Sequence, residues 1–446
     1  MSMSIIADLH LHSKYSRAVS QKMDLKEIAF WAKRKGINLV STADWTHPLW
    51  FREIKENLTE KSPGIFRLKD GSFPEVSFIL STEVSSIYNQ DGKTRRIHNL
   101  IFSPSLETAE KVIKKLQEQG INLLADGRPT MGISAKNLLE FLLSIDKNIF
   151  LIPCHIWTPW FSLYGSKSGF DSIQEAFGKY SNYIYAVETG LSSDPIMNWQ
   201  IEELETRAIV SFSDAHSGQK LGREATVFIK NNNHFDDNFS YFDIIDAFKQ
   251  KRDSNLKIGY TIEFFPEEGK YHWSGHRICG VRYSPEDILK KGEICPVCSK
   301  PLTIGVENRV LKLAKNVFKN EDIFLAKNRF DVTFVYDKEK KKTPFVSLVP
   351  LMEILEEIHQ STKKAEDEYQ RLTKNLGTEF EILFRKSYEE IENIGGKTLK
   401  EAIEIVRARK VYVDPGFDGV FGVVKIFKKE ENESSNKQEK EQLNLF

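Results

Sequence analysis

Short apolar runs, each bounded by polar residues, recur through the first half of the chain. Runs of this length between polar turns are typical of buried strands. The five clearest are residues 5–7, 37–40, 78–80, 149–152 and 209–212. Amphipathic stretches elsewhere in this half predict helices over Leu25–Lys35, Glu107–Gln119, Ala135–Leu143 and Tyr241–Lys251. Because strands and helices alternate, we expect an α/β domain with a parallel sheet or barrel.

The pattern changes further along the chain. Residues 266–305 are rich in Gly, His and Cys with little periodicity, which is typical of a small module held by a metal. Residues 306–428 have mostly helical periodicity and close with two short strands predicted within residues 410–427. We therefore expect a barrel over 1–265, a zinc-binding module over 266–305, a mainly helical region over 306–428 and a disordered tail over 429–446.

Composition narrows the class of protein only slightly. The chain is 40% hydrophobic and 28% charged, as in ordinary soluble globular proteins. Its 63 Lys and Arg residues equal its 63 Asp and Glu residues, so net charge neither indicates nor excludes a nucleic-acid partner. We see no secretory signal and no apolar stretch of about 18 residues, so we expect no membrane span. Four cysteines, three of them close together, favour a metal site in a reducing cytoplasm over disulfides.

Histidines and carboxylates gather at the ends of the predicted strands. Side chains at i and i+2 of a strand share a face, so Asp8, His10 and His12 point the same way. Functional groups at the carboxyl ends of parallel strands meet at one rim of an α/β barrel. Histidine with carboxylate is a ligand set for zinc, manganese or iron. The residues that we predict to bind metal are His10, His12, Asp44, His47, Glu83, His98, His155, Asp214 and His216.

These motifs resemble the polymerase and histidinol phosphatase (PHP) family of metallophosphoesterases. The resemblance is carried by His-x-His at 10–12, Glu83, His98, His155 and Ser-Asp-Ala-His at 213–216. It implies a distorted seven-stranded β/α barrel with two to three divalent ions, Zn, Mn or Mg, at its rim. Two positions depart from the family pattern. Ala18 stands where many members have a further His, and Trp45 follows Asp44 where many have His, so the resemblance carries least weight for Asp44 and His47.

Three segments narrow the resemblance to the endonuclease Q family, namely residues 8–18, 43–48 and 155–166. The resemblance covers nearly the whole chain. It implies a metal-dependent DNA repair endonuclease that cleaves 5′ of deaminated bases, such as hypoxanthine and uracil, and of abasic sites. Two alternatives stay open. A PHP-type small-molecule phosphatase would not need the cysteine module, and a nonhydrolytic DNA-binding accessory would not need a complete ligand set.

The predicted chemistry requires no protein nucleophile. Divalent ions lower the pKa of a bound water and stabilise both the attacking and the leaving oxygen of a displacement at phosphorus. We expect Asp214, Glu83 and His155 to be the catalytic members of the ligand set, with the carboxylates bridging or orienting metal. Cys154 fits a small buried thiol better than a nucleophile, because the predicted barrel has no second thiol.

Aromatic and basic side chains follow two of the predicted ligands directly. Aromatic rings beside a catalytic rim can stack on nucleobases, which stabilises binding by about 1–3 kcal/mol per base, and basic residues there can contact phosphates. The alternatives are aromatic residues that cap the barrel core and a basic loop that is simply solvated. The residues that we expect at a DNA interface are Lys14, Tyr15, Arg17, Trp157, Trp160, Phe161 and Tyr164.

A second metal site is predicted by two pairs of ligands with two-residue gaps. The pairs are His276 with Cys279 and Cys295 with Cys298, separated by a loop of zinc-ribbon length. This spacing predicts a tetrahedral structural zinc site, in which His272 is the alternative fourth ligand. The metal would replace a hydrophobic core too small to fold alone, and the module would position a DNA-contacting surface.

The last five residues, 442–446, end a charged tail with three apolar side chains. They resemble the Gln-Leu-x-Leu-Phe peptide by which bacterial repair proteins bind the sliding clamp. A short anchor on a disordered tether suits partner recognition. The alternative is a terminus that folds back onto the protein's own surface. We therefore expect the bacterial sliding clamp as a partner, bound by Gln442, Leu443, Leu445 and Phe446.

Overall fold

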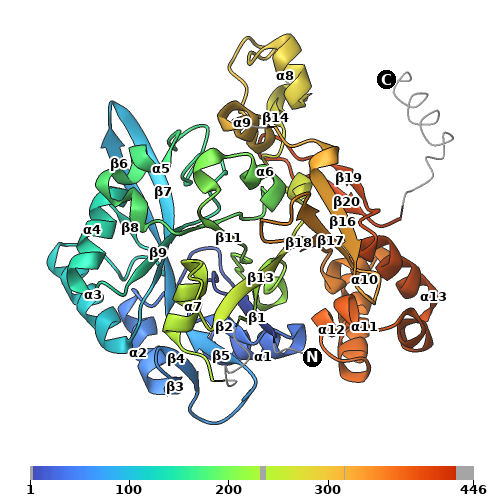
Figure 1. Ribbon diagram of the computed structural model, residues 1–446, viewed down its shortest axis with the longest axis horizontal. Helices are drawn as coiled ribbons and strands as arrows, with labels where there is room; N and C mark the ends of the chain where they lie inside the picture. The colour runs from blue at the N-terminus through green and yellow to red at the C-terminus, as the bar shows by residue number, and fades with distance from the viewer. Residues whose placement is uncertain (1–3, 232–237, 316, 428–446) are drawn as a thin grey trace, which may run out of the picture.

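The computed structural model describes residues 4–231, 238–315 and 317–427 of the 446-residue chain (Figure 1). The tail that we predict to be disordered and the clamp-binding residues Gln442, Leu443, Leu445 and Phe446 lie outside the described residues. The described part is a mixed α/β fold, as the alternating pattern predicted. Within it, none of the helices combines the length and apolar character that crossing a lipid bilayer requires.

All five predicted strands are present in the first half of the chain. β1 (Ser4–Asp8) pairs in parallel with β2 (Leu39–Ser41), which pairs in parallel with β5 (Ser77–Ile79). The other two are β9 (Phe150–Pro153) and β11 (Ala208–Val210). The further strands of this half are β3 (Leu58–Ser62), β4 (Ile65–Leu68), β6 (Ser81–Gln90), β7 (Lys93–Phe102), β8 (Thr130–Met131), β10 (Ala186–Glu188) and β12 (Ala225–Lys230).

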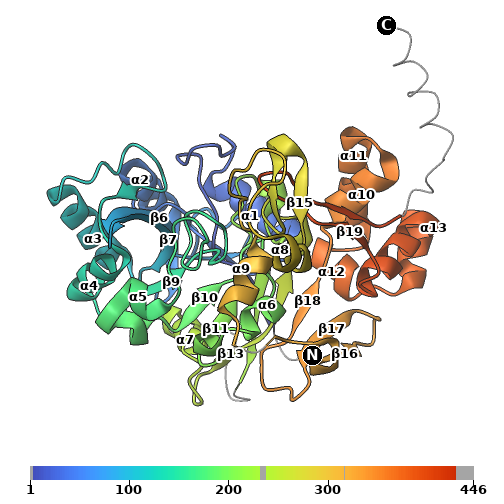
Figure 2. The same cartoon turned by 90° about the horizontal axis from the view of Figure 1, so that it is seen from above.

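One face of these strands lines a shared apolar interior. Side chains alternate along β1, so that Ile5, Ala7 and Leu9 join the interior cluster while Ile6 packs with the cluster under the helices. The interior cluster also receives residues from β2, β5, β7, β9, β10, β11 and β12. Helices α3, α4 and α5 lie outside strands β6, β7 and β9 (Figure 2). This arrangement is barrel-like, and the count of seven barrel strands stays a prediction.

The four predicted helices are confirmed with small shifts of their ends. α1 (Leu25–Lys35) has the predicted bounds, because the Asp24 side chain caps its first turn and Gly36 ends it with a φ of 90°. α7 (Tyr241–Phe248) stops three residues before the predicted Lys251, and Gln250 takes a left-handed φ of 51°. The other helices of this half are α2 (Pro48–Asn57), α3 (Leu106–Glu118), α4 (Ala135–Ile145), α5 (Ile173–Phe177) and α6 (Pro195–Trp199).

The second half of the chain is built onto the sheet of the first. β13 (Leu256–Glu263) pairs with β12 on one side and with β18 (Phe345–Ser347) on the other, so one ten-stranded sheet spans both halves. The region expected to be mainly helical therefore also supplies β16 (Ile323–Lys327), β17 (Thr333–Asp337) and β18 to this sheet. Its helices are α9 (Val306–Leu313), α10 (Leu351–His359), α11 (Thr362–Asn375), α12 (Glu379–Phe384) and α13 (Tyr388–Arg407).

Two smaller sheets complete the second half. β14 (Ser274–His276), β15 (Val281–Tyr283) and α8 (Pro285–Lys291) form the cysteine-containing module. β19 (Tyr412–Asp414) and β20 (Val423–Lys425) form an antiparallel pair, which confirms the two closing strands predicted around glycine-containing turns.

A buried ion pair joins the C-terminal helices to the barrel. Lys35 Nζ, at the end of α1, lies 2.8 Å from Glu379 Oε2 at the start of α12, and both side chains are almost fully buried. The Glu379 carboxylate also accepts hydrogen bonds from the Leu351 N–H at 3.0 Å and the Tyr369 hydroxyl at 2.7 Å. Buried charges are tolerated only with such a complete set of partners. The contact therefore holds α1 and α12 in one arrangement.

We expect Lys35→Ala to lower the free energy of unfolding by about 3–5 kcal/mol, because it leaves the Glu379 carboxylate buried without its counter-charge. Denaturant unfolding measures the change. Lys26→Ala is the matched control, since its ion pair with Asp70 also spans 2.8 Å but is exposed, and it should change stability little. Equal effects of the two substitutions would contradict a stabilising role for burial of the Lys35 pair.

Candidate metal centre

Most of the predicted metal ligands meet at one rim of the barrel. His98 lies in β7, which runs antiparallel to β6 and so reaches the rim where the other strands end. Three of the others follow β1, β9 or β11 directly in the sequence. Six of the predicted ligands fall into two groups of converging donor atoms: His10, His12, Glu83, His98, His155 and Asp214.

The first donor group contains His10, His12, Glu83 and Asp214, whose ligand atoms lie within 4.8 Å of one another. His12 Nε2 is 3.2 Å from Glu83 Oε2 and 3.1 Å from Asp214 Oδ1. His10 Nε2 is 3.7 Å from each of the same two oxygens and, although buried, has no hydrogen-bond partner. A buried nitrogen that points into a cage of carboxylate oxygens without bonding to them fits a metal ligand.

The second donor group contains Glu83, His98 and His155. Glu83 Oε1 is 2.6 Å from His98 Nδ1 and 3.1 Å from His155 Nε2. Glu83 therefore directs Oε1 into this group and Oε2 into the first. A carboxylate with one oxygen in each of two donor groups fits a bridge between two divalent ions.

The protonation states at the rim suit metal binding. Burial raises the pKa of Glu83, but the positive charges of His98 and Arg128 more than compensate, so its pKa is well below the ordinary value. Burial lowers the pKa of His98 to about 4, which keeps this imidazole neutral. Metals bind ionised carboxylates and neutral imidazoles. Imidazole and carboxylate donors converge here, so the residues present fit Zn, Mn or Fe.

Three predicted ligands lie outside these two groups. Asp44 accepts hydrogen bonds from the Ser13 N–H at 2.7 Å and the Ser16 hydroxyl at 2.8 Å, and its other oxygen lies 3.3 Å from His12 Nδ1. Asp44 is thus placed to orient His12. His47 caps α2 by accepting from the Trp50 N–H. His216 is half-exposed beside His12, and its Nδ1 bonds to the Asp214 backbone carbonyl at 2.8 Å.

Two residues at the rim were missed by the sequence reasoning. Glu188 Oε1 lies 2.8 Å from His10 Nδ1, and Glu188 Oε2 accepts a hydrogen bond from the His155 N–H. It ends the apolar run 184–187, so the strand-end pattern used for the other ligands could have found it. Arg128 Nη1 lies 3.0 Å from Glu83 Oε2. Arg128 comes from a loop with no pattern that marks it.

Backbone strain is concentrated at the strand ends that carry the site. Asp44, His155 and Asp214 have left-handed φ values of 37°, 28° and 47°. Such conformations cost about 1–3 kcal/mol each in non-glycine residues and persist only where the surroundings hold them. Gly190 packs so closely against His155 that an added Cβ would lie 2.3 Å from the His155 Cβ. The surrounding packing therefore holds the ligands in place before anything binds.

The aromatic loop after His155 is only partly accessible. Trp157 and Tyr164 are fully buried, and they bond to Asn198 and Glu203. This corrects the expectation that these two side chains face DNA, because their apolar rings satisfy the core and their polar atoms have internal partners. Trp160 and Phe161 are half-buried.

The accessible part of the aromatic loop lies between the rim and a later segment of the chain. The Phe161 ring lies 4.9 Å from that of His98. The Trp160 ring meets that of Tyr271 edge-on at 5.6 Å. Tyr271 directly precedes the cysteine module, so the loop connects the rim with this module.

The basic loop after His12 is also divided. Lys14 Nζ and the Tyr15 hydroxyl both bond to Glu53, at 2.9 and 2.7 Å, and the Tyr15 ring stacks on His47 at 4.4 Å. Arg17 is 78% exposed and lies 3.4 Å from Asp126. Arg17 is therefore the cation of this loop that is most accessible to a phosphate.

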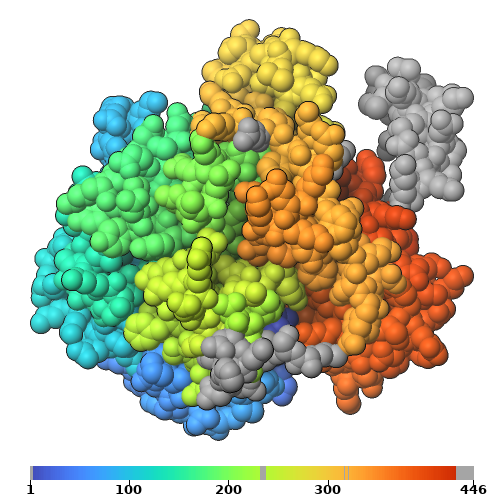
Figure 3. Space-filling model, in the orientation of Figure 1, coloured from blue at the N-terminus to red at the C-terminus, as the bar shows by residue number. Residues whose placement is uncertain are grey.

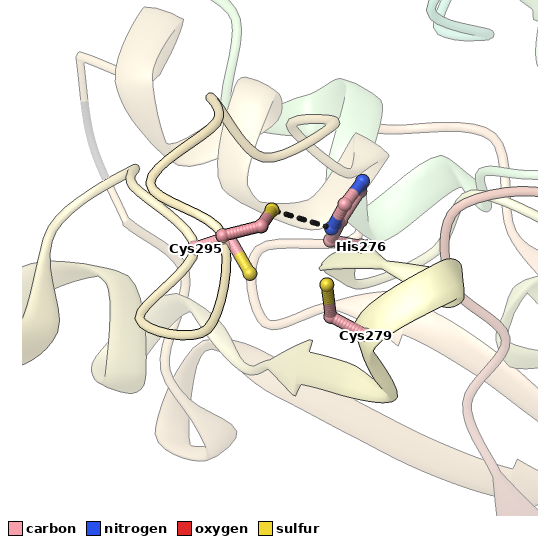
Figure 4. A group of neighbouring side chains, drawn as sticks. His276, Cys279 and Cys295 are labelled. Atoms are coloured by element: carbon pink, nitrogen blue, oxygen red, sulfur yellow. Dashed lines mark hydrogen bonds between the residues drawn. The ribbon is translucent and has the colours of Figure 1, made fainter.

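The cysteine module brings its predicted ligands together. His276, Cys279, Cys295 and Cys298 have ligand atoms within 4.8 Å of one another, and Figure 4 shows the first three converging. Burial raises the pKa of the Cys295 thiol, but the backbone N–H groups of Cys298 and Val297 bring it down to about 6. Thiolate and imidazole donors at tetrahedral numbers fit a structural zinc ion. His272 is buried away from this group, beside Glu307 at 3.6 Å.

Replacing Cys295 and Cys298 with Ser should release one zinc ion per chain and unfold the module, because its own apolar core is small. Metal analysis and hydrogen exchange over residues 266–305 measure the two effects. Cys154→Ser is the matched control, since this buried thiol lies outside the module. An unchanged zinc content in the double variant would rule out these thiols as ligands.

Comparison with known proteins gives a partial match to a protein family. Residues 350–410 match the family described as MJ0043 C-terminal domain. Uncharacterized protein MJ0043 of Methanocaldococcus jannaschii is 30% identical over 274 residues, which make up 60% of this chain and 31% of that protein. The chain thus spans about a third of the length of this relative.

Two solved structures are similar over nearly the whole chain. The lesion-specific endonuclease PfuEndoQ from Pyrococcus furiosus has a TM-score of 0.78 and 29% identity, covering 98% of this chain and 99% of that one. Endonuclease Q in complex with a 27-mer duplex substrate with an abasic lesion at the active site has a TM-score of 0.79 and 29% identity, covering 97% and 100%. These likenesses confirm the resemblance to endonuclease Q, and the close match supports a metal-dependent DNA endonuclease.

Proposed function

We propose that this chain is a DNA repair endonuclease that hydrolyses the phosphodiester on the 5′ side of a damaged nucleotide. The observation that carries the proposal is the shared carboxylate of Glu83, which places one oxygen in each of two histidine-rich donor groups. Paired divalent ions are suited to in-line displacement at phosphorus. The likeness to two endonuclease Q structures supports DNA as the substrate.

The residues at the rim divide the work of holding the reactants. His10, His12 and Asp214 would hold one ion and His98 and His155 the other. Two donor groups make two ions the expected number, and half-exposed His216 leaves a donor for a third. When bound, such ions favour hydroxide at neutral pH and stabilise negative charge on phosphoryl oxygens.

Arg128 is the residue of this site best suited to meet the scissile phosphate. Its guanidinium contacts Glu83 at 3.0 Å, and 27% of its side chain is exposed at the rim. A guanidinium forms paired hydrogen bonds with phosphate oxygens and always carries a positive charge. No protein nucleophile is needed, since burial raises the pKa of the Cys154 thiol well above its ordinary value.

The lesions that we propose as substrates are hypoxanthine, uracil and abasic sites. These share weakened base pairing or none, so extruding the damaged nucleotide costs less free energy than extruding a normal one. The abasic site is supported by the substrate in one of the similar endonuclease Q structures. Half-buried Trp160 and Phe161 lie beside the rim and could stack on an extruded or neighbouring base.

The clamp interaction belongs to the same proposal but rests on sequence alone. Residues 442–446 lie outside the described residues, so their binding to a bacterial sliding clamp stays a prediction. Such tethering would raise the local concentration of the enzyme at newly synthesised DNA without altering its chemistry.

Asp214→Ala should lower nicking of lesion-containing duplexes by roughly a thousandfold or more, because the metal centre is deprived of a ligand. The folded state, followed by circular dichroism, should persist. Asp70→Ala removes an exposed carboxylate and should nick normally. Normal nicking by folded Asp214→Ala protein would exclude Asp214 from the mechanism.

The same assay separates the alternative functions when a phosphate monoester is tested beside the DNA. Hydrolysis of the monoester alone by wild-type protein loaded with Mn²⁺ would replace the proposal with a small-molecule phosphatase. Tight binding of lesion DNA without hydrolysis of either substrate would replace it with a binding accessory.

Trp160→Ala should weaken lesion-DNA binding or turnover by about tenfold with little loss of stability, because its half-exposed ring contacts only the rim of the core. Trp157→Ala should instead lower the free energy of unfolding by about 3–5 kcal/mol, since its ring is buried and its Nε1–H bonds to Asn198. Unfolding curves and binding titrations of both variants decide the point. Normal DNA binding by a destabilised Trp160→Ala protein would reassign Trp160 to the core.

A further inference from the structure

The cysteine module exposes large apolar side chains to an unusual degree. Ile278 and Leu289 are each 85% exposed, Val297 is 69% exposed and Ile294 is 51% exposed. The module is small, and its own core consists of Val281, Ile288, Cys295 and Leu302. Exposed apolar side chains in a group mark a surface that a partner covers.

Three of these side chains are gathered around the proposed zinc site. Ile278 directly precedes Cys279, Ile294 precedes Cys295, and Val297 precedes Cys298. Because the ligand atoms converge within 4.8 Å, the neighbouring apolar side chains surround the same centre. Figure 3 shows the module as a lobe that projects from the rest of the molecule. The apolar tips therefore belong to a projecting surface.

Unpaired cations lie next to these apolar tips. Arg277 precedes Ile278, Lys290 follows Leu289, and Lys300 lies shortly after Val297, and all three cations are exposed. Among the described residues, no carboxylate forms an ion pair with any of them, whereas neighbouring Lys291 pairs with Asp287. Apolar tips flanked by free cations complement a partner that has both an apolar and a strongly anionic part.

The module also lies beside the rim that carries the metal centre. Tyr271, just before the module, meets Trp160 of the aromatic loop, and the Ser166 hydroxyl of the same loop donates to the Ile304 carbonyl at 3.0 Å. Between this loop, the tip of the β6–β7 hairpin and α9 lies a cavity of about 680 Å³. The cations that line this cavity are Lys93, Arg95, Lys167, Arg309 and Lys312.

We propose that the module binds the DNA duplex beside the lesion, with Ile278, Ile294 and Val297 entering a groove and Arg277, Lys290 and Lys300 contacting phosphates. The inference rests on the proposed function, which supplies DNA as the partner. Duplex DNA offers what the surface complements, since its grooves expose apolar edges of bases and sugars between two rows of phosphates. Apolar wedges that partly unstack base steps also bend the duplex, and bending assists extrusion of a nucleotide toward the rim.

The test uses purified full-length protein and a duplex with one abasic site, so that no other protein can account for the result. Ile278→Ser/Val297→Ser should weaken binding to the duplex by about tenfold or more while zinc content stays at one ion per module. Leu325→Ser is the matched control, because this side chain on β16 is 58% exposed but lies outside the module. It should bind DNA as the wild type does.

A second variant keeps the inference testable if the apolar substitutions disturb the module. Arg277→Gln/Lys300→Gln leaves the small core and the ligands intact. It should reduce the slope of log affinity against log salt by about 2, because each phosphate that the protein no longer neutralises lowers the slope by about 1. Unchanged affinity in the first variant together with an unchanged slope in the second would overturn the inference.

Two controls separate this inference from its foundation and from a different partner. If wild-type protein does not nick the abasic duplex, the proposed function fails; if it nicks but both module variants bind the duplex normally, only the inference about the module fails. Light scattering of the wild type and the Ile278→Ser/Val297→Ser variant is measured in parallel. A wild-type dimer that becomes a monomer, with DNA binding intact, would assign the surface to a second copy of the chain and overturn the proposal.

Discussion

The arrangement of the rim depends on one buried carboxylate. Glu83 is fully buried, and an ionised carboxylate in such a place is stable only when surrounded by donors and positive charge. Its two oxygens contact His98, His155, His12 and Arg128 at 2.6–3.2 Å, and these partners arrive from β7, β9, β1 and a loop. The strands can therefore close around the site in only a narrow range of positions.

The supporting structure is built to keep those positions. Strained residues at three strand ends and the close packing of Gly190 on His155 show that the rim is held by its surroundings. The second half of the chain contributes to this support. β13 continues the barrel sheet into β18, and the buried pair of Lys35 and Glu379 fixes the C-terminal helices against α1. The two halves are therefore parts of one scaffold.

The same scaffold connects the proposed chemistry with the proposed DNA surface. The aromatic loop buries Trp157 and Tyr164 in the core and leaves Trp160 and Phe161 half-exposed between the rim and the cysteine module. The buried pair fixes the loop, so the exposed pair has a defined place. A loop anchored in this way lets a rigid duplex-binding surface act on a nucleotide at the metal centre.

The sequence by itself determined the strands, the four helices and the types of ligand, because apolar periodicity is a local property and His, Asp, Glu and Cys reveal their chemistry wherever they stand. It also indicated the cysteine module from spacing alone. Only the tertiary structure decided that Asp44 orients His12, that His47 caps a helix, that Glu188 and Arg128 complete the rim, and that Trp157 is buried. These roles depend on which residues distant in the chain become neighbours, and the close packing that decides it is set by the whole fold.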